Sequence, residues 1–233
     1  MQKKDFRQTF SIVASLALIL FFLITAVHFW SFNQAFYDSE HAKLTLYGKS
    51  ISEHIGITDD QLKDLTAFTL AYLNDKDASL DLQMKVKGEM REVYTDDEKA
   101  HMIDVRNLNL TANRLWVISL LTILGYAVFY LIKKYPLSDL YGSYKKVLKY
   151  GLLFLAVLGS WILIDFDSFW TAFHHVFFAG NDLWILDLRK DILIMIVPPE
   201  FFNHLVITIT VTFFILLLSP IVLYRLFVKR KSA

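Results

Sequence analysis

The chain has no cysteine, only 4 prolines and 8 glycines in 233 residues, and a formal net charge of +1. Without cysteine there can be no disulfide, no thiolate metal ligand and no cysteine nucleophile or thioester intermediate. The near-neutral balance excludes the strongly basic character of a nucleic-acid-binding protein, so no nucleic-acid partner is expected. The glycines are scattered singly, and no phosphate-binding glycine motif occurs.

What the chain has in excess is apolar sequence. Hydrophobic residues make up 55%, phenylalanine alone contributes 20 residues, and the mean hydropathy is +0.41. Four apolar runs come close to the roughly 20 residues that a helix needs to cross a bilayer. Because the backbone must satisfy its own hydrogen bonds in lipid, these runs are expected to be helices. We predict a mainly α membrane protein with spans at 10–30, 114–132, 147–164 and 200–224.

The first apolar run follows a basic start, so a cleaved signal peptide is the alternative to a membrane anchor. Its apolar part is longer than the usual 7–15 residues, and no small-x-small cleavage site precedes Asp38. We interpret the run as an uncleaved anchor.

Charge predicts the orientation of the spans. Basic residues dominate the first nine residues, the loop 133–146 and the tail 225–233, whereas residues 31–113 hold nine Lys or Arg against fifteen Asp or Glu. The second connecting segment, 165–199, is acidic as well. By the positive-inside rule both termini lie in the cytoplasm and the two acidic segments lie outside.

The first outer segment, 31–113, is long enough to fold. Apolar residues recur at helical spacing after Thr58, and apolar and polar residues alternate over 80–86, which predicts a strand that returns as a hairpin through 90–94. The sequence Thr95-Asp96-Asp97-Glu98 is a capping box that begins a helix leading to the second span. We therefore expect a small mixed α/β extracytoplasmic domain.

The second outer segment, 165–199, is unusually aromatic. Five aromatic residues fall on one helical stripe that suits a helix lying in the membrane interface: Phe166, Phe169, Trp170, Phe173 and Phe177. Asn181 and Asp182 are expected to end this helix. Pro198 and Pro199 are expected to begin the last span.

Four of the seven histidines have ordinary explanations. His28 and His204 lie at the outer ends of spans, where a polar tip at the headgroup level is common. His41 and His54 lie among charged residues, and we predict that they are solvated surface residues.

His101 and His174 are the candidate catalytic residues. His101 precedes Asp104 by three residues, so the carboxylate shares its helix face and can orient or charge the imidazole. His174 lies in the aromatic segment, at four-residue spacing from Trp170 and Phe178. Proton-transferring side chains beside lipid-facing aromatics suit a reaction on a lipid headgroup. The structural alternative is an interfacial histidine bonded to a carbonyl. His175 points about 100° away from His174 on a helix and is the weaker candidate.

The same histidines and aspartate suggest a metal site as an alternative. Neither HExxH nor the multi-histidine boxes of di-iron membrane enzymes occur, so metal-free acid–base chemistry ranks first and no cofactor is expected.

Several motifs resemble one known family. The block Glu98–Val105 (EKAHMIDV), the block Phe173–Phe178 (FHHVFF), and Asn181, Trp184, Asp191 and Pro199–Phe202 (PEFF) resemble the lipoprotein intramolecular transacylase (Lit) family of bacterial membrane proteins. The resemblance implies an acyltransferase of the plasma membrane. It would move the sn-2 acyl chain of a diacylglyceryl-cysteine lipoprotein to the cysteine's own α-amino group, giving a lyso-form lipoprotein. The family histidines map to His101 and His174, or to His175 if the doubled histidine shifts the register.

This chemistry suits a chain without cysteine, because the nucleophile is the substrate's amine. Ester-to-amide transfer needs no ATP, which agrees with the missing phosphate loop. Our first hypothesis makes His101, assisted by Asp104, the base, and His174 the acid or oxyanion donor; the reverse assignment stays open.

The supporting residues follow from the same hypothesis. Asn181 would contribute an oxyanion amide, and Arg106 would pair with a carboxylate of the substrate or of the protein itself. Trp170, Phe178 and Trp184 would line the acyl-chain groove or anchor the interface. We expect a monomer that contacts membrane lipid. The rival functions are a non-enzymatic four-span protein whose outer domain binds a partner, and a metal-dependent lipid hydrolase.

Overall fold

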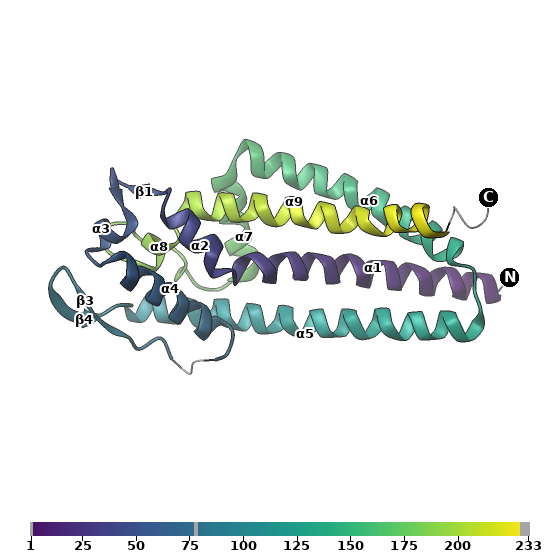
Figure 1. Ribbon diagram of the computed structural model, residues 1–233, viewed down its shortest axis with the longest axis horizontal. Helices are drawn as coiled ribbons and strands as arrows, with labels where there is room; N and C mark the ends of the chain where they lie inside the picture. Colours follow the sequence, from purple (N-terminus) through teal and green to yellow (C-terminus); the bar gives the residue numbers. More distant parts are fainter. Residues whose placement is uncertain (1, 77–78, 229–233) are drawn as a thin grey trace. The chain divides into compact units, whose positions relative to one another are not determined.

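The computed structural model describes residues 2–76 and 79–228 (Figure 1). These residues form two compact units. The helical unit comprises residues up to 28, 112–169 and from 208 onward, and the mixed unit comprises 29–111 and 170–207 apart from residues 77–78. The basic residues 229–231 of the tail, on which the predicted orientation partly depends, lie outside the described residues.

Four long helices supply the helical unit. They are α1 (Gln2–Ser31), α5 (Asp96–Lys133), α6 (Leu137–Ile164) and α9 (Pro199–Leu223), which continues as a π-helix, η1 (Tyr224–Val228). Each is long and apolar enough to cross a membrane, so the prediction of four spans in a mainly α protein is confirmed. The last helix begins at Pro199, as the proline pair predicted.

The connection between the second and third spans is shorter than the predicted loop 133–146. Helix α6 begins at Leu137, directly after Pro136 at its N-cap, and Gly142 lies inside the helix. The sequence interpretation treated this glycine as a loop residue. A single glycine weakens a helix by only about 1 kcal/mol, and the surrounding helix formers outweigh that cost.

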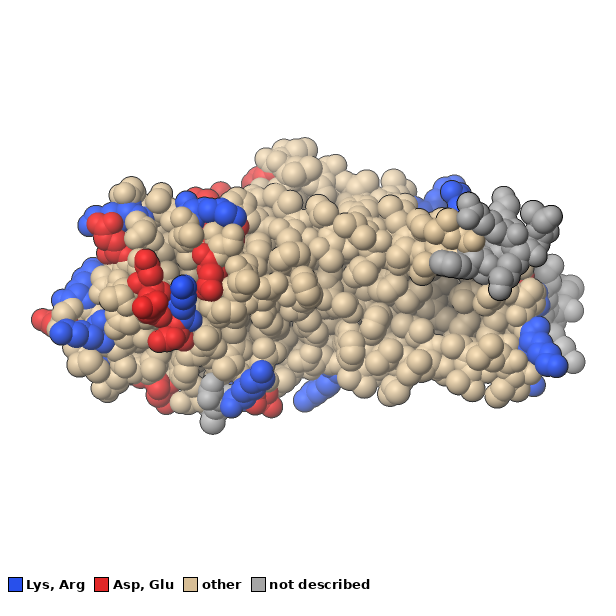
Figure 2. All heavy atoms as spheres, viewed as in Figure 1, with Lys and Arg blue, Asp and Glu red and all other residues tan. Residues whose placement is uncertain are grey.

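The helical unit packs through small apolar clusters and a few polar contacts, and it leaves much of its apolar surface exposed. Tyr144 Oη donates a 2.6 Å hydrogen bond to the Leu217 carbonyl, and the Ser11 and Tyr126 hydroxyls lie 2.8 Å apart. Large apolar side chains remain exposed, with Leu163 78% and Ile164 85% accessible. Figure 2 shows a broad band across the long helices that has no charged side chain on the face drawn. Such a surface suits a hydrocarbon solvent.

The mixed unit contains short helices and two hairpins, besides the first part of α5 and the last part of α7 (Phe166–Phe177). Its other elements are α2 (Gln34–His41), β1 (Thr45–Leu46), β2 (Lys49–Ser50), α3 (Ile51–Ile55), α4 (Asp59–Leu73), β3 (Gln83–Val86), β4 (Glu89–Glu92) and α8 (Ile192–Ile196). One apolar core joins most of them, and its buried residues include Ile51, Leu65, Val93 and Met102, with Ile192 and Leu193 from α8. The expected mixed α/β character is confirmed.

The β3–β4 hairpin is the one that the alternating sequence predicts. Val86 pairs with Glu89 across a two-residue turn in which Lys87 and Gly88 both have positive φ, 53° and 90°. This is the geometry of a type I′ turn. The β1–β2 hairpin was not expected, because two strands of two residues each give too short a pattern to detect.

Gly56 allows the β3–β4 turn to dock on α3. It has φ +88° at the helix C-cap, and its carbonyl accepts a 2.8 Å hydrogen bond from Lys87 N. A Cβ here would lie 2.4 Å from Lys87 Cγ. Only glycine fits both the backbone angle and the close approach.

The prediction that His41 and His54 are solvated was wrong for His41 and only partly right for His54. His41 is buried, with Nε2 2.8 Å from the Ile196 carbonyl of α8, and His54 is half-buried with Nε2 3.3 Å from the Leu188 carbonyl. Both partners are more than 130 residues away along the chain, so local charge patterning gave no signal for them.

Candidate active site

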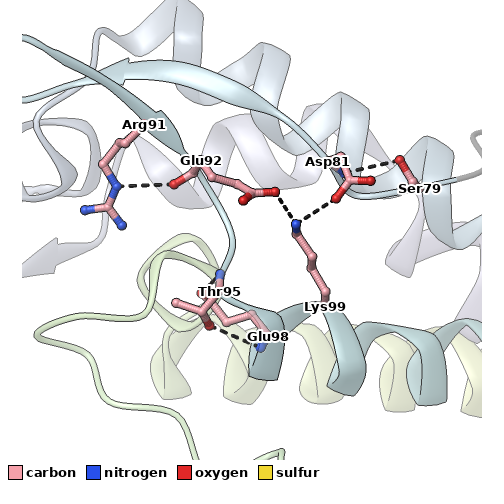
Figure 3. Close-up of polar contacts among 7 residues, drawn as sticks. All are labelled: Ser79, Asp81, Arg91, Glu92, Thr95, Glu98 and Lys99. Atoms are coloured by element: carbon pink, nitrogen blue, oxygen red, sulfur yellow. Dashed lines mark hydrogen bonds and ion pairs between the residues drawn. The ribbon is translucent and has the colours of Figure 1, made fainter.

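The site begins where the chain enters α5. Thr95 N donates to Glu98 Oε2 at 2.7 Å, and Glu98 N donates to Thr95 Oγ1 at 3.3 Å (Figure 3). This reciprocal pair is the predicted capping box, which satisfies two backbone amides at the helix start. In the same turn Lys99 binds Asp81 at 2.7 Å and also pairs with Glu92, so it ties the β3–β4 hairpin to α5 (Figure 3). The first turn of α5 is thereby fixed before the chain reaches His101.

His101 of α5 and His174 of α7 lie against each other. Their ring centroids are 6.2 Å apart with planes 30° from parallel, and the residues are only 7% and 6% exposed. His175 is exposed and contacts Trp184 edge-on, 5.3 Å between centroids. Of the two neighbouring histidines, the structure therefore brings His174 to His101.

Aromatic side chains enclose the histidine pair. Trp184 stacks on His174 at 4.7 Å and 27°, and Trp170 meets the same ring edge-on at 4.8 Å. Phe178 contacts both imidazoles, at 5.2 Å from His101 and 5.5 Å from His174. The predicted site residues Trp170, Phe178 and Trp184 thus all touch a histidine.

A hydrogen bond fixes the neutral tautomer of His174. Its Nδ1 lies 2.7 Å from the Trp170 carbonyl, one helical turn earlier. Because a carbonyl can only accept, Nδ1 must carry the proton. In the neutral ring Nε2 is then left with its lone pair, which is the state of a proton acceptor.

Both imidazoles favour the neutral form. Burial lowers the pKa of His101 to about 4, the nearby His174 adds to the effect, and the charge of Asp104 opposes it. Burial also lowers the pKa of His174, although its bond to the Trp170 carbonyl acts in the other direction. These groups belong to the mixed unit, and the charged first turns of α5 precede its apolar stretch. At neutral pH both rings are uncharged and able to accept or relay a proton.

Asp104 does not make the contact that the sequence suggested. Its Oδ2 accepts a 3.0 Å hydrogen bond from Asn181 Nδ2, and no hydrogen bond between Asp104 and His101 is present among the described residues. The Nδ1 atom of His101 is buried without a partner there. Asp104 therefore joins α5 to the segment that follows α7, and Asn181 also accepts a bond from Leu183 N at 3.2 Å.

Arg106 lies apart from the histidine contacts. It pairs with Asp75 and covers the Tyr72 ring, with its guanidinium carbon 4.8 Å from the ring centroid. These contacts hold α5 to the end of α4. Arg106 therefore links two helices in the structure.

Glu98 is a site residue that the sequence indicated only as a helix cap. It is 1% exposed, and its Oε1 accepts a 2.7 Å bond from Leu193 N while Oε2 accepts from Thr95 N. Burial raises its pKa, the charge of Asp191 adds to this, and the backbone donors oppose it. One buried carboxylate thus links the turn before His101 to α8, a contact across 95 residues that no local pattern predicts.

No group of three or more His, Asp or Glu side chains is close enough to hold a metal ion within residues 2–76 and 79–228. The side chains around the histidine pair are aromatic rings, which do not supply the further ligands that a metal ion would need.

Fold and site together define an integral membrane protein of four candidate spans with a buried histidine pair in a small mixed unit. The sequence matches the family profile described as lipoprotein intramolecular transacylase Lit over residues 12–202. The chain belongs to this family, and it is an acyltransferase that acts on lipoproteins.

Solved structures agree with the family match. The chain resembles the membrane-integral lipoprotein intramolecular transacylase Lit from Bacillus cereus with a TM-score of 0.81 and 21% identity, over 98% of this chain and 99% of that one. A variant of that protein with a histidine-to-arginine mutation gives a TM-score of 0.77 at 21% identity, over 99% and 95% of the two chains. At this identity the likeness supports the fold. A search of the curated proteins finds no match.

Proposed function

We propose that the chain moves the sn-2 acyl chain of a diacylglyceryl-cysteine lipoprotein to the α-amino group of that cysteine, giving a lyso-form lipoprotein. Two histidines carry the proton transfers without a metal or other cofactor. The observation that supports this most is the buried pair of His101 and His174, in which His174 Nδ1 is held by the Trp170 carbonyl and Nε2 is left as an acceptor.

The reaction balances within one substrate molecule. The amine nitrogen attacks the ester carbonyl carbon, a C–N bond forms, the bond to the sn-2 oxygen breaks, and one proton passes from nitrogen to that oxygen. No water or external nucleophile is consumed, which agrees with the absence of cysteine. The protein's task is to align amine and ester, and effective molarities of about 10⁵ M or more show how much alignment can contribute.

The geometry favours the second of the two proton assignments that the sequence left open. His174 has a fixed tautomer with Nε2 free, so we assign it the base that takes the amine proton. His101 lacks the carboxylate partner that would have made it the stronger base, and we assign it the return of a proton to the sn-2 oxygen. The proton that His174 takes makes its ring cationic until the proton passes through the neighbouring His101 to the sn-2 oxygen, after which both imidazoles are neutral again.

The oxyanion of the tetrahedral intermediate needs a donor, and Trp184 fits better than Asn181. The Asn181 side chain already donates to Asp104 and accepts from Leu183 N. In contrast, Trp184 Nε1 is buried without a partner among the described residues, on a ring stacked against His174. A buried N–H without an acceptor is costly, and an oxyanion that appears only during the reaction would satisfy it. Trp170 and Phe178 would then line the path of the acyl chain.

We also propose the placement of the site in the cell. The acid-rich mixed unit lies outside the bacterial plasma membrane, both termini are cytoplasmic, and the chain works as a monomer at the outer leaflet. The charge difference between connecting segments supports this orientation.

Expression in a bacterium that lacks other N-acylating activity tests the proposal. Tandem mass spectrometry of a lipoprotein's N-terminal peptide should show an N-acylated cysteine beside a monoacylglyceryl group, because total mass alone does not change. His174→Ala and His101→Ala should each return a free amine with intact diacylglyceryl. His175→Ala, which removes an exposed neighbour, should keep the N-acylated product. N-acylation by the His174→Ala protein would refute the assignment.

A further inference from the structure

The mixed unit contains a cavity that the histidine site does not use. It has a volume of about 520 Å³, within the range of about 300–1,000 Å³ typical of ligand sites. Residues from α3, the β3–β4 turn, the start of α5 and the segment 182–195 line it, and neither His101 nor His174 does.

Cations gather at this cavity although its surroundings are acidic. Lys87, Arg91, Arg189 and Lys190 all line it. Arg189 and Lys190 are the only Lys or Arg in residues 165–199, so both cationic side chains of this segment lie at the cavity. In the described part of the chain, Lys87, Arg91 and Lys190 have no ion pair, whereas Arg189 is held by Asp187.

The facing carboxylates do not neutralise this group. Asp191 is buried at the cavity and accepts a 2.7 Å bond from Asp187 N. Asp97 and Asp182 line the cavity as well, so four cations face three carboxylates and the lining has a formal net charge of +1. In Figure 3, Arg91 Nε donates a 3.2 Å hydrogen bond to the backbone carbonyl of Glu92, while the carboxylates of Asp81 and Glu92 pair with Lys99 and not with Arg91.

The cavity adjoins the histidine site through one short segment. Trp184 stacks on His174, while its neighbours Leu183 and Ile185 line the cavity. Asn181, at the start of this segment, is bonded to Asp104 of α5. A substrate whose cysteine lies at the histidine pair would have a polar, cationic space within reach along the same segment.

We propose that this cavity binds the polypeptide that follows the acylated cysteine, with a preference for acidic side chains. The inference rests on the proposed function, because it takes the lipid-bearing cysteine to lie at the histidine pair. A peptide offers both carboxylates for Lys87, Arg91 and Lys190 and backbone groups for the polar rim. Such contacts choose among lipoproteins without taking part in the acyl transfer.

Purified full-length protein in detergent can be assayed with two synthetic diacylated lipopeptides. One begins with the acidic sequence Cys-Asp-Glu, and the other begins with the neutral sequence Cys-Asn-Gln. The wild type should have a KM for the acidic peptide roughly three- to tenfold below that for the neutral one, as expected for two partly exposed charge pairs. Arg91→Gln/Lys190→Gln should bring the KM ratio close to one. Lys85→Gln removes the charge of an exposed lysine on the same hairpin outside the cavity, and it should keep the wild-type ratio.

Three results would overturn the inference. Equal KM values for the two peptides in the wild type would show no acidic preference. An equal loss of preference in Lys85→Gln would assign the effect to general charge. A loss in Arg91→Gln/Lys190→Gln that depends on added anionic lipid and not on the peptide would assign the cavity to a headgroup. Failure of the proposed function looks different, since neither lipopeptide would then be N-acylated.

Discussion

Trp184 brings a buried hydrogen-bond donor to the histidine pair. Its indole N–H is buried without an acceptor among the described residues, although its ring is well packed on His174. Trp184→Phe keeps most of the ring and removes the donor. If the N–H stabilises the oxyanion, kcat should fall about 10²-fold or more while KM changes little.

Steady-state kinetics on a diacylated lipopeptide measures this effect. Trp161→Phe is the matched control, because it removes an indole N–H from α6, outside the mixed unit. A wild-type kcat in Trp184→Phe would contradict the assignment and would mean that another donor stabilises the oxyanion.

The buried state of His101 also predicts a pH dependence of stability. Its pKa is about 4 in the folded protein against 6.5 in the unfolded chain. As pH falls from 6.5 towards 4, the unfolded chain takes up a proton that the folded one refuses, so stability is lost over this range and is fully present above it. The thermal unfolding temperature should therefore drop between pH 7.5 and 5, and His101→Gln should reduce that drop. The exposed His175→Gln should not, and an equal reduction in both would contradict the assignment.

At the scale of elements, the buried carboxylate of Glu98 joins α5 to α8. It accepts bonds from Thr95 N and Leu193 N, and its removal leaves the buried Leu193 N without an acceptor, whereas water can reach Thr95 N. Glu98→Ala should lower the free energy of unfolding by about 1–3 kcal/mol, the cost of one buried unsatisfied donor. Chemical denaturation compared with Asp96→Ala, an exposed acid in the same turn, measures the difference. Equal costs for the two variants would mean that the helix dipole, and not the link to α8, explains the effect.

Elements with a local signal could be predicted, and contacts between distant elements could not. The capping box at Thr95 and the alternation before Gly88 each depend on a few neighbouring residues. The start of α5 and the β3–β4 hairpin are accordingly present in the predicted regions. The burial of His41 depends on a carbonyl of α8, and the bond from Asn181 redirects Asp104 away from His101. The meeting of His101 and His174 was expected only through the family resemblance, because residues 73 apart share no periodic pattern.

At the scale of the whole molecule, the absence of cysteine makes the orientation easy to test. Single cysteines can be introduced at Lys85 in β3 and at Ser138 in the first turn of α6, both exposed in the structure. If the mixed unit lies outside the membrane, a membrane-impermeant thiol reagent should label Lys85→Cys in intact cells and Ser138→Cys only after permeabilisation. The reverse pattern would invert the proposed topology.

The acyl transfer itself is the central claim, and a substrate with distinguishable chains tests it most directly. A synthetic diacylglyceryl lipopeptide with an isotopically labelled sn-2 chain is incubated with the purified full-length protein, and the product is fragmented by tandem mass spectrometry. We predict that the label moves entirely to the cysteine α-nitrogen in the wild type and stays on glycerol with His174→Ala. A labelled free fatty acid, or an N-linked chain without label, would contradict intramolecular transfer from sn-2.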